Sequence, residues 1–107
     1  MLLGIKRYNK TDESGRDSVH NYYEKLVFEE ILKASTEAKT DGNFLADVAC
    51  VALNRLPPRY VRYDVDMSFF LSPVELEEIT HKVQNAVLEA IEYVSNSDKN
   101  RGANTAN

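Results

Sequence analysis

The 107-residue sequence contains a single cysteine, Cys50, which excludes an intramolecular disulfide bond and a zinc site built from several cysteines. Its four glycines are scattered at positions 4, 15, 42 and 102, so no glycine-rich loop is present to hold a phosphate chain. No apolar run approaches the roughly 18–20 residues of a membrane span, and the N-terminus becomes charged too early for a signal peptide. These absences predict one soluble domain in the cytoplasm.

The charge is acidic overall and unevenly distributed. The chain has 17 Asp and Glu against 13 Lys and Arg, a net charge of −4. Residues 1–10 carry three cations and no acid, and so do residues 54–63, so the remainder of the chain carries −10. We do not expect such a body to bind long nucleic acid, because non-specific binding depends mostly on attraction to phosphates. The two basic clusters are nevertheless suited to a small anion.

Apolar periodicity predicts two helices in the first half of the chain. The first is expected to begin at Asp17 or Ser18 and to end near Ala38, because its apolar residues recur at three-and-four spacing. The second is expected over residues 43–56, where Leu, Val and Ala form one continuous stripe. Pro57 must end it, because proline lacks an amide hydrogen and its ring clashes with the preceding helical turn.

A third helix is predicted in the second half. Residues 72–75, with the sequence SPVE, form a capping box with proline at the first helical position, and the apolar face that follows extends to about residue 95. Residues 1–17 are polar and rich in turn formers, which predicts an N-terminal arm. Residues 96–107 contain no apolar residue larger than alanine, which predicts a disordered tail. The domain is therefore expected over residues 18–95.

Residues 59–71 alternate in polarity, which is typical of a half-buried strand. Val61, Tyr63, Val65, Met67 and Phe69 would share one face, and Arg62, Asp64, Asp66 and Ser68 the other. A strand needs a partner, and three remain open: the N-terminal arm, a hairpin bend within the segment, or the same strand of a second chain. The predicted fold class is α+β and mostly α, with three main helices, one or two short strands, and a homodimeric assembly.

Catalytic arrangements are poorly supported. His20 and His81 fall on different predicted helices without a positional link to Cys50, which is expected to be a small buried thiol beside the apolar stripe. Asp64 and Asp66 share a strand face and could hold a cation or pair with Arg62, but two acids do not make a metal site. The sequence therefore predicts no enzyme, no metal and no cofactor.

Three arginines gather around the rigid Pro57–Pro58 corner, and Tyr60 and Tyr63 lie among them. A guanidinium group can engage phosphate or the O6/N7 edge of guanine with two hydrogen bonds, and its flat face stacks on a base. The alternative is that Arg55, Arg59 and Arg62 pair with carboxylates of the acidic helices. The residues alone leave both interpretations open.

Three features resemble the late competence development ComFB family. They are the segment ALNRLPPRYV at residues 52–61, Asp47 five residues before it, and the segment VHNYYEKLV at residues 19–27, in which Asn21 and Glu24 follow the family pattern. Many members carry several cysteines before the second helix and are thought to bind zinc there, and this chain lacks them. It is more similar to the cysteine-poor, cyanobacterial-type members, which are described as receptors for cyclic di-GMP.

This resemblance implies a non-enzymatic homodimer that binds cyclic di-GMP, with cyclic di-AMP as a second candidate ligand. It would relay the signal to a protein partner, such as a transcription regulator, in the control of cell size, motility or competence. Two phosphates and two guanines require arginine forks, stacking surfaces and an acid. An isologous dimer shares the two-fold symmetry of the ligand. The alternative is a constitutive dimeric scaffold or adaptor without a nucleotide ligand.

The ligand-binding residues are expected in two segments. The LPPRY neighbourhood contributes Arg55, Arg59, Tyr60 and Arg62. The arm contributes Arg7, Asp12, Ser14 and Arg16. The arm residues are proposed because TDESGR places an acid, a hydroxyl and an arginine within five residues, outside any predicted helix. The alternative for the arm is a plain solvated tail.

Overall fold

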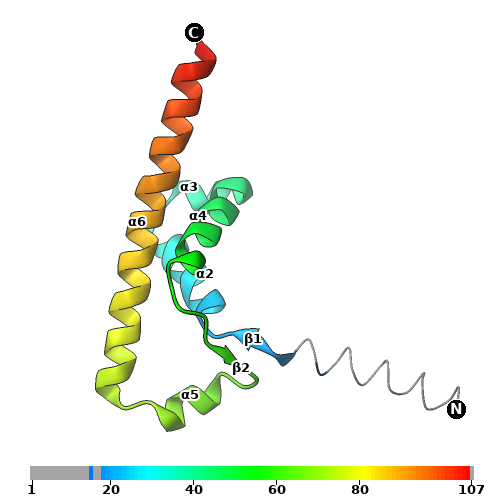
Figure 1. The fold of residues 1–107 in the computed structure, drawn as a ribbon, viewed down its shortest axis with the longest axis vertical. Helices are drawn as coiled ribbons and strands as arrows, with labels where there is room; N and C mark the ends of the chain where they lie inside the picture. The colour runs from blue at the N-terminus through cyan, green and yellow to red at the C-terminus, as the bar shows by residue number, and fades with distance from the viewer. Residues whose placement is uncertain (1–14, 16–17, 107) are drawn as a thin grey trace, which may run out of the picture.

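A computed structural model describes residue 15 and residues 18–106, with side chains described through Asp98. Three helices, α2 (Tyr23–Ala34), α4 (Gly42–Asn54) and α6 (Pro73–Ala106), pack against one another. In Figure 1, α6 follows the long axis of the molecule, and α2 and α4 lie along one side of it. The short helix α3 (Glu37–Thr40) joins α2 to α4.

The remaining elements lie toward the end of the molecule where α6 begins (Figure 1). Strands β1 (His20–Asn21) and β2 (Tyr60–Val61) pair antiparallel, with His20 opposite Val61, and α5 (Val65–Phe70) leads from β2 toward α6. The predicted class, mostly helical with one or two short strands, is confirmed for the single chain, which adds the short helices α3 and α5 to the three main ones. None of the described helices combines the length and the apolar character that a membrane crossing requires.

The core forms where the three long helices meet. Its members that are fully shielded from solvent are Val27 and Ile31 of α2, Val48 and Ala52 of α4, and Val87 and Ala90 of α6. These residues recur at three-and-four spacing, so each helix buries one stripe and leaves its charged face outside. The predicted stripes of the second and third helices are therefore confirmed. The apolar stripe predicted for the first helix ran from Val19 to Ala34, and it was wrong at these two ends, because both residues are exposed.

The predicted first helix is shorter than expected at both ends. His20 and Asn21 pair with β2 instead of continuing a helix, and the backbone N–H of Tyr23 donates to Oδ1 of Asn21 at 3.2 Å. At the other end Ser35 adopts extended backbone angles, and its Oγ accepts from the N–H of Ala38 at 3.3 Å. A serine that bonds to the backbone three residues later starts a new helix rather than prolonging the old one.

Capping residues begin both later helices. Asp41 accepts hydrogen bonds from the N–H groups of Asn43 (3.0 Å) and Phe44 (3.1 Å) at the start of α4. The predicted cap at Ser72 is confirmed, because Ser72 Oγ accepts from the N–H of Glu75 and donates to its Oε1, both at 3.2 Å. α6 continues to Ala106, through the segment in which a disordered tail was expected. Once a helix is nucleated, each added residue costs little, and no proline lies in that segment to stop it.

The long strand predicted over residues 59–71 was wrong beyond Val61. Among the described residues its only pairing partner is β1, which is two residues long and lies just after the segment predicted as the arm. An apolar segment that has no further strand to pair with folds instead as α5. Helical spacing then directs Met67 and Leu71, four residues apart, into the core.

Candidate functional site

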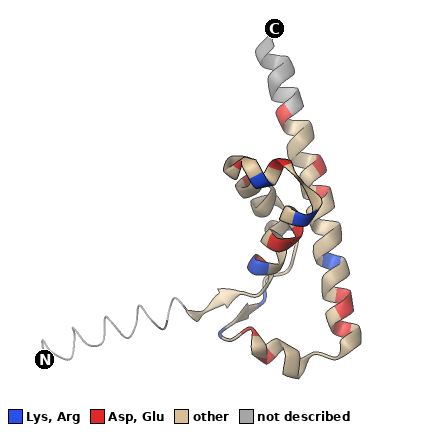
Figure 2. Cartoon of the chain, turned by 180° about the vertical axis from the view of Figure 1, so that it is seen from behind, with Lys and Arg blue, Asp and Glu red and all other residues tan. Residues whose placement is uncertain are grey.

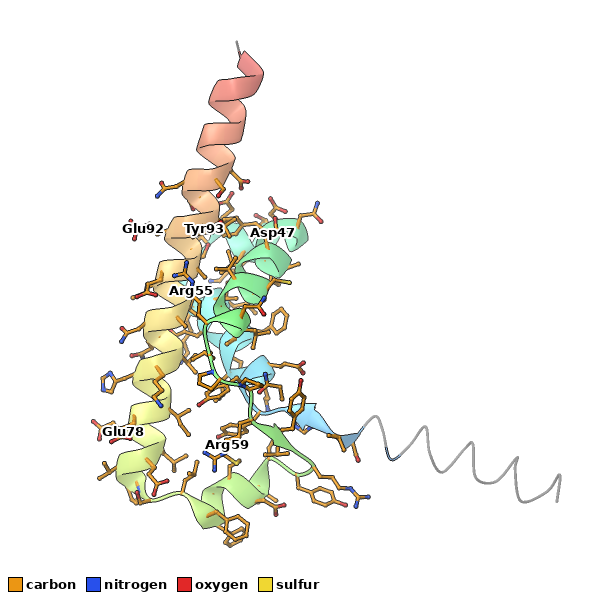
Figure 3. The ribbon with its side chains drawn as sticks, viewed as in Figure 1. Asp47, Arg55, Arg59, Glu78, Glu92 and Tyr93 are labelled. Atoms are coloured by element: carbon orange, nitrogen blue, oxygen red, sulfur yellow. The ribbon has the colours of Figure 1, made fainter. Side chains whose placement is uncertain are left out.

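The Pro57–Pro58 corner divides the three arginines between two places. Arg55 comes before the prolines, at the C-terminal end of α4, and faces α6. Its Nη1 lies 3.1 Å from Oε2 of Glu89, and its guanidinium lies 5.6 Å from the ring centroid of Tyr93. Figure 3 shows Arg55 beside α6, whereas Arg59 lies nearer the end where α6 begins. For Arg55, the alternative interpretation, pairing with a carboxylate of an acidic helix, is therefore observed.

The second group of arginines, Arg59 and Arg62, lies on either side of β2. Arg59 follows the prolines directly, and its backbone is held on both sides by residues that precede α2. Its N–H donates to Oδ1 of Asn21 at 3.0 Å, and its carbonyl accepts from the N–H of Tyr22 at 2.7 Å. Because Asn21 is buried, this contact fixes the path of β2.

The side chains of Arg59, Tyr60 and Arg62 are exposed along this fixed backbone. The guanidinium of Arg62 lies 5.1 Å from the ring centroid of Tyr63. Burial raises the pKa of the Tyr22 hydroxyl above 10.0, whereas the nearby guanidinium of Arg59 lowers that pKa. The charge of Arg59 therefore acts on the surface around Tyr22.

A shallow groove of about 310 Å³ adjoins β2 through Tyr22 and Asp64. It is lined by Tyr22, Lys25, Leu26, Glu29, Asp64, Val65 and Ser68, so it presents a cation, two acids and two hydroxyls. One end is fixed by His20, whose Nε2 lies 2.6 Å from Oδ1 of Asp64 and whose Nδ1 lies 3.0 Å from the carbonyl oxygen of Ser18. We call Arg59, Tyr60 and Arg62, together with this groove, the β2 site.

Both ring nitrogens of His20 face oxygen acceptors. A neutral imidazole can donate from only one nitrogen, so the protonated ring fits this geometry better. The hydrogen bond to Asp64 and the one to the Ser18 carbonyl accordingly raise the pKa of His20 above 6.5. The positive ring beside Asp64 compensates part of the carboxylate charge at the edge of the groove.

Of the eight predicted site residues, Arg59, Tyr60 and Arg62 are exposed on and beside β2, and Arg55 lies against α6. Arg7, Asp12, Ser14 and Arg16 lie outside the described residues. Sequence reasoning missed the groove residues Tyr22 and Lys25, because both were placed on a long helix whose relation to β2 was unknown. The signal that could have found them is Asn21, a buried polar residue whose side chain bonds to the backbone of both Tyr23 and Arg59.

Cys50 is exposed, so the predicted buried thiol was wrong. It lies on the side of α4 that is turned away from the fully buried stripe. A second open groove, of about 400 Å³, is lined by Asp47, Cys50, Val51, Tyr93, Val94 and Ser97. In the part of the chain that the structure describes, no three His, Cys, Asp or Glu side chains gather as metal ligands would.

These features define a small, mostly helical domain with a basic, aromatic strand exposed beside a polar groove. The family model of the late competence development protein ComFB matches residues 20–98. The chain therefore belongs to the ComFB family, and the match covers α2, α4 and β2 completely. No curated protein and no solved structure matches the chain.

Proposed function

We propose that this chain is a non-enzymatic receptor that binds cyclic di-GMP at the β2 site as a homodimer. Binding would change the surface offered to a protein partner, for which a transcription regulator is one candidate. A ligand can shift the chain between two forms only if it binds them with unequal affinity. Cyclic di-AMP is the second candidate ligand.

The observation that supports this proposal most is the exposure of Arg59, Tyr60 and Arg62 on a backbone fixed by Asn21. Arginine forks bind phosphate oxygens in pairs, and arginine and tyrosine faces stack on purines. Side chains on a fixed strand lose less entropy on binding than side chains on a free loop. The segment thus supplies cations and stacking surfaces in a prearranged position.

The groove beside β2 supplies what a guanine would need in addition. Guanine offers N–H donors on its N1/N2 edge, and Asp64 is an exposed carboxylate at the groove's edge. Lys25 adds a cation for a phosphate, and Ser68 adds a hydroxyl. A cyclic dinucleotide has two-fold symmetry, so two copies of the β2 site across a dimer axis would match it.

Isothermal titration calorimetry of the whole chain with cyclic di-GMP tests the proposal. We expect saturable heat at micromolar ligand and modest salt, and loss of that heat in Arg59→Ala and Arg62→Ala. The matched control is Lys39→Ala, which removes an exposed cation of α3, away from β2. Absence of heat with the unaltered chain would overturn the proposal, and equal heat from cyclic di-AMP would reassign the ligand. Sedimentation measured with and without ligand tests the homodimer.

The alternative is a constitutive dimeric scaffold in which arginines only hold helices together. The contacts of Arg55 with Glu89 and Tyr93 favour it, because they link α4 to α6 without a ligand. A scaffold predicts that Arg59→Ala and Arg62→Ala lower thermal stability and leave every ligand response unchanged. The receptor predicts near-normal stability and lost binding in the same two variants.

A further inference from the structure

The segment from Tyr63 to the first turns of α6 carries an unusually exposed apolar surface. Its large apolar side chains, which we call the α5 face, are Tyr63, Val65, Phe69, Phe70 and Val74. The rings of Phe69 and Phe70 are 80% and 79% exposed. An aromatic side chain of this size is normally buried to a large extent, and a contiguous exposed group of them marks an interaction site.

The local fold does not need these side chains. The segment packs against the hydrophobic core through Met67 and Leu71, which are both buried. Val65 and Phe69 are four residues apart, so they share the opposite side of α5. Two adjacent phenylalanines in water contribute little to the folding of this chain, and their apolar area remains available for a second molecule.

The charged side chains around this surface are all acidic. Between Tyr63 and His81 the sequence contains no Lys or Arg. The acids in the same segment are Asp64, Asp66, Glu75, Glu77 and Glu78, of which all but Asp66 are exposed. Figure 2 shows acidic residues on α5 and on the first turns of α6, with no basic residue between them. The α5 face is therefore an apolar surface with an acidic rim.

The acidic rim favours one of three candidate binding partners for the α5 face. A second copy that docked through the same face would bring two acidic rims together, and like charges oppose that contact. An anionic membrane surface would be repelled for the same reason. A cationic, amphipathic helix satisfies both properties, because its apolar side covers the phenylalanines while its Lys and Arg side chains reach the carboxylates.

We infer that the α5 face docks a basic amphipathic helix of a partner protein. The inference deepens the relay that the proposed function requires. The α5 face follows β2 directly in the chain, and Asp64 belongs both to the acidic rim and to the groove of the β2 site. Docking itself does not require cyclic di-GMP.

Fluorescence anisotropy with the full chain tests the inference. The probe is a labelled helical peptide of Leu and Lys, about 18 residues long and with one apolar face. We expect saturable binding that weakens with salt, and an affinity loss of at least about tenfold in the Phe69→Ser/Phe70→Ser variant. Glu77→Gln/Glu78→Gln should weaken binding and reduce its salt dependence. The matched control is Leu88→Ser, which removes an exposed apolar side chain from a later turn of α6.

Three outcomes would overturn the inference. The first is binding of the peptide to Phe69→Ser/Phe70→Ser as tightly as to the unaltered chain. The second is conversion of a sedimenting dimer to monomers by those substitutions, because the face would then be covered by a second copy. The third is tighter binding to phosphatidylglycerol vesicles than to the peptide, with the same dependence on Phe69 and Phe70. Calorimetry with cyclic di-GMP on the same variant separates failure of docking from failure of the receptor, since the variant leaves Arg59 and Arg62 intact.

Discussion

The side-chain Oδ1 of Asn21 accepts a hydrogen bond from the backbone N–H of Arg59 at 3.0 Å, although 38 residues separate the two in sequence. The same oxygen accepts the N–H of Tyr23, the first residue of α2. Pro57 and Pro58 have no N–H, so Arg59 is the first residue after the corner that can donate. One buried side chain therefore joins the start of α2 to the start of β2.

Asn21→Ala should lower the free energy of unfolding by about 1–3 kcal/mol, because it leaves two backbone donors without their acceptor in a buried place. Urea denaturation followed by circular dichroism measures this. Asn85→Ala is the control, because Asn85 is exposed on α6 and its loss should change stability by less than about 0.5 kcal/mol. Equal stability of the two variants would show that Asn21 does not hold β2.

Helix periodicity in the sequence predicted the core of α4 and α6 because these helices bury one stripe each, and the pattern is local. The prediction failed where the structure depends on contacts distant in sequence. The same segment also contains the four-residue spacing of Met67 and Leu71 that a short helix can bury, and β1 is too short to pair with the segment beyond Val61. The polarity pattern of this segment gives no information about the length of β1.

The candidate site was predicted in part for the same reason. The sequence singled out all three arginines because they are close along the chain. It did not predict that the prolines direct Arg55 to Glu89 and leave Arg59 and Arg62 on β2. Nor did it predict the contact of His20 with Asp64, 44 residues away, because the strand that brings them together was assigned to a helix.

The contact between His20 and Asp64 predicts a pH dependence. The pKa of His20 is raised above 6.5, first by its hydrogen bond to Asp64 and then by the Ser18 carbonyl. The stabilising contribution of this pair is therefore fully present below pH 6.5 and is lost as the pH rises through the folded-state pKa. We expect His20→Ala to destabilise the protein more at pH 6 than at pH 9.

Nuclear magnetic resonance of the imidazole ring measures this directly. In Asp64→Asn, which keeps the size but removes the charge of the partner, the His20 titration should move toward lower pH. An unchanged His20 midpoint would mean that Asp64 does not hold the proton on the ring.

Substitutions at the N-cap of α4 are predicted to change the stability of the protein. Asp41→Ala removes the acceptor of the N–H groups of Asn43 and Phe44 and should cost about 0.5–2 kcal/mol of folding free energy. Asp41→Asn keeps an oxygen at the same place and should cost less than the alanine variant. Thermal unfolding of both variants measures the difference. An asparagine variant as unstable as the alanine variant would attribute the effect to charge instead of to the hydrogen bonds.

The division of the arginines at the proline corner separates a role in stability from a role in binding. Arg55→Ala removes an exposed ion pair with Glu89 and a contact with the ring of Tyr93, so it should cost about 0.5–1 kcal/mol of stability. Cyclic di-GMP binding should be unchanged, because Arg55 lies on α4 and not on β2. Arg59→Ala and Arg62→Ala should do the reverse, with stability changed by less than about 0.5 kcal/mol and affinity lowered at least about tenfold. Calorimetry and urea denaturation of the three variants give both quantities, and loss of affinity in Arg55→Ala would extend the site across the prolines and contradict this division.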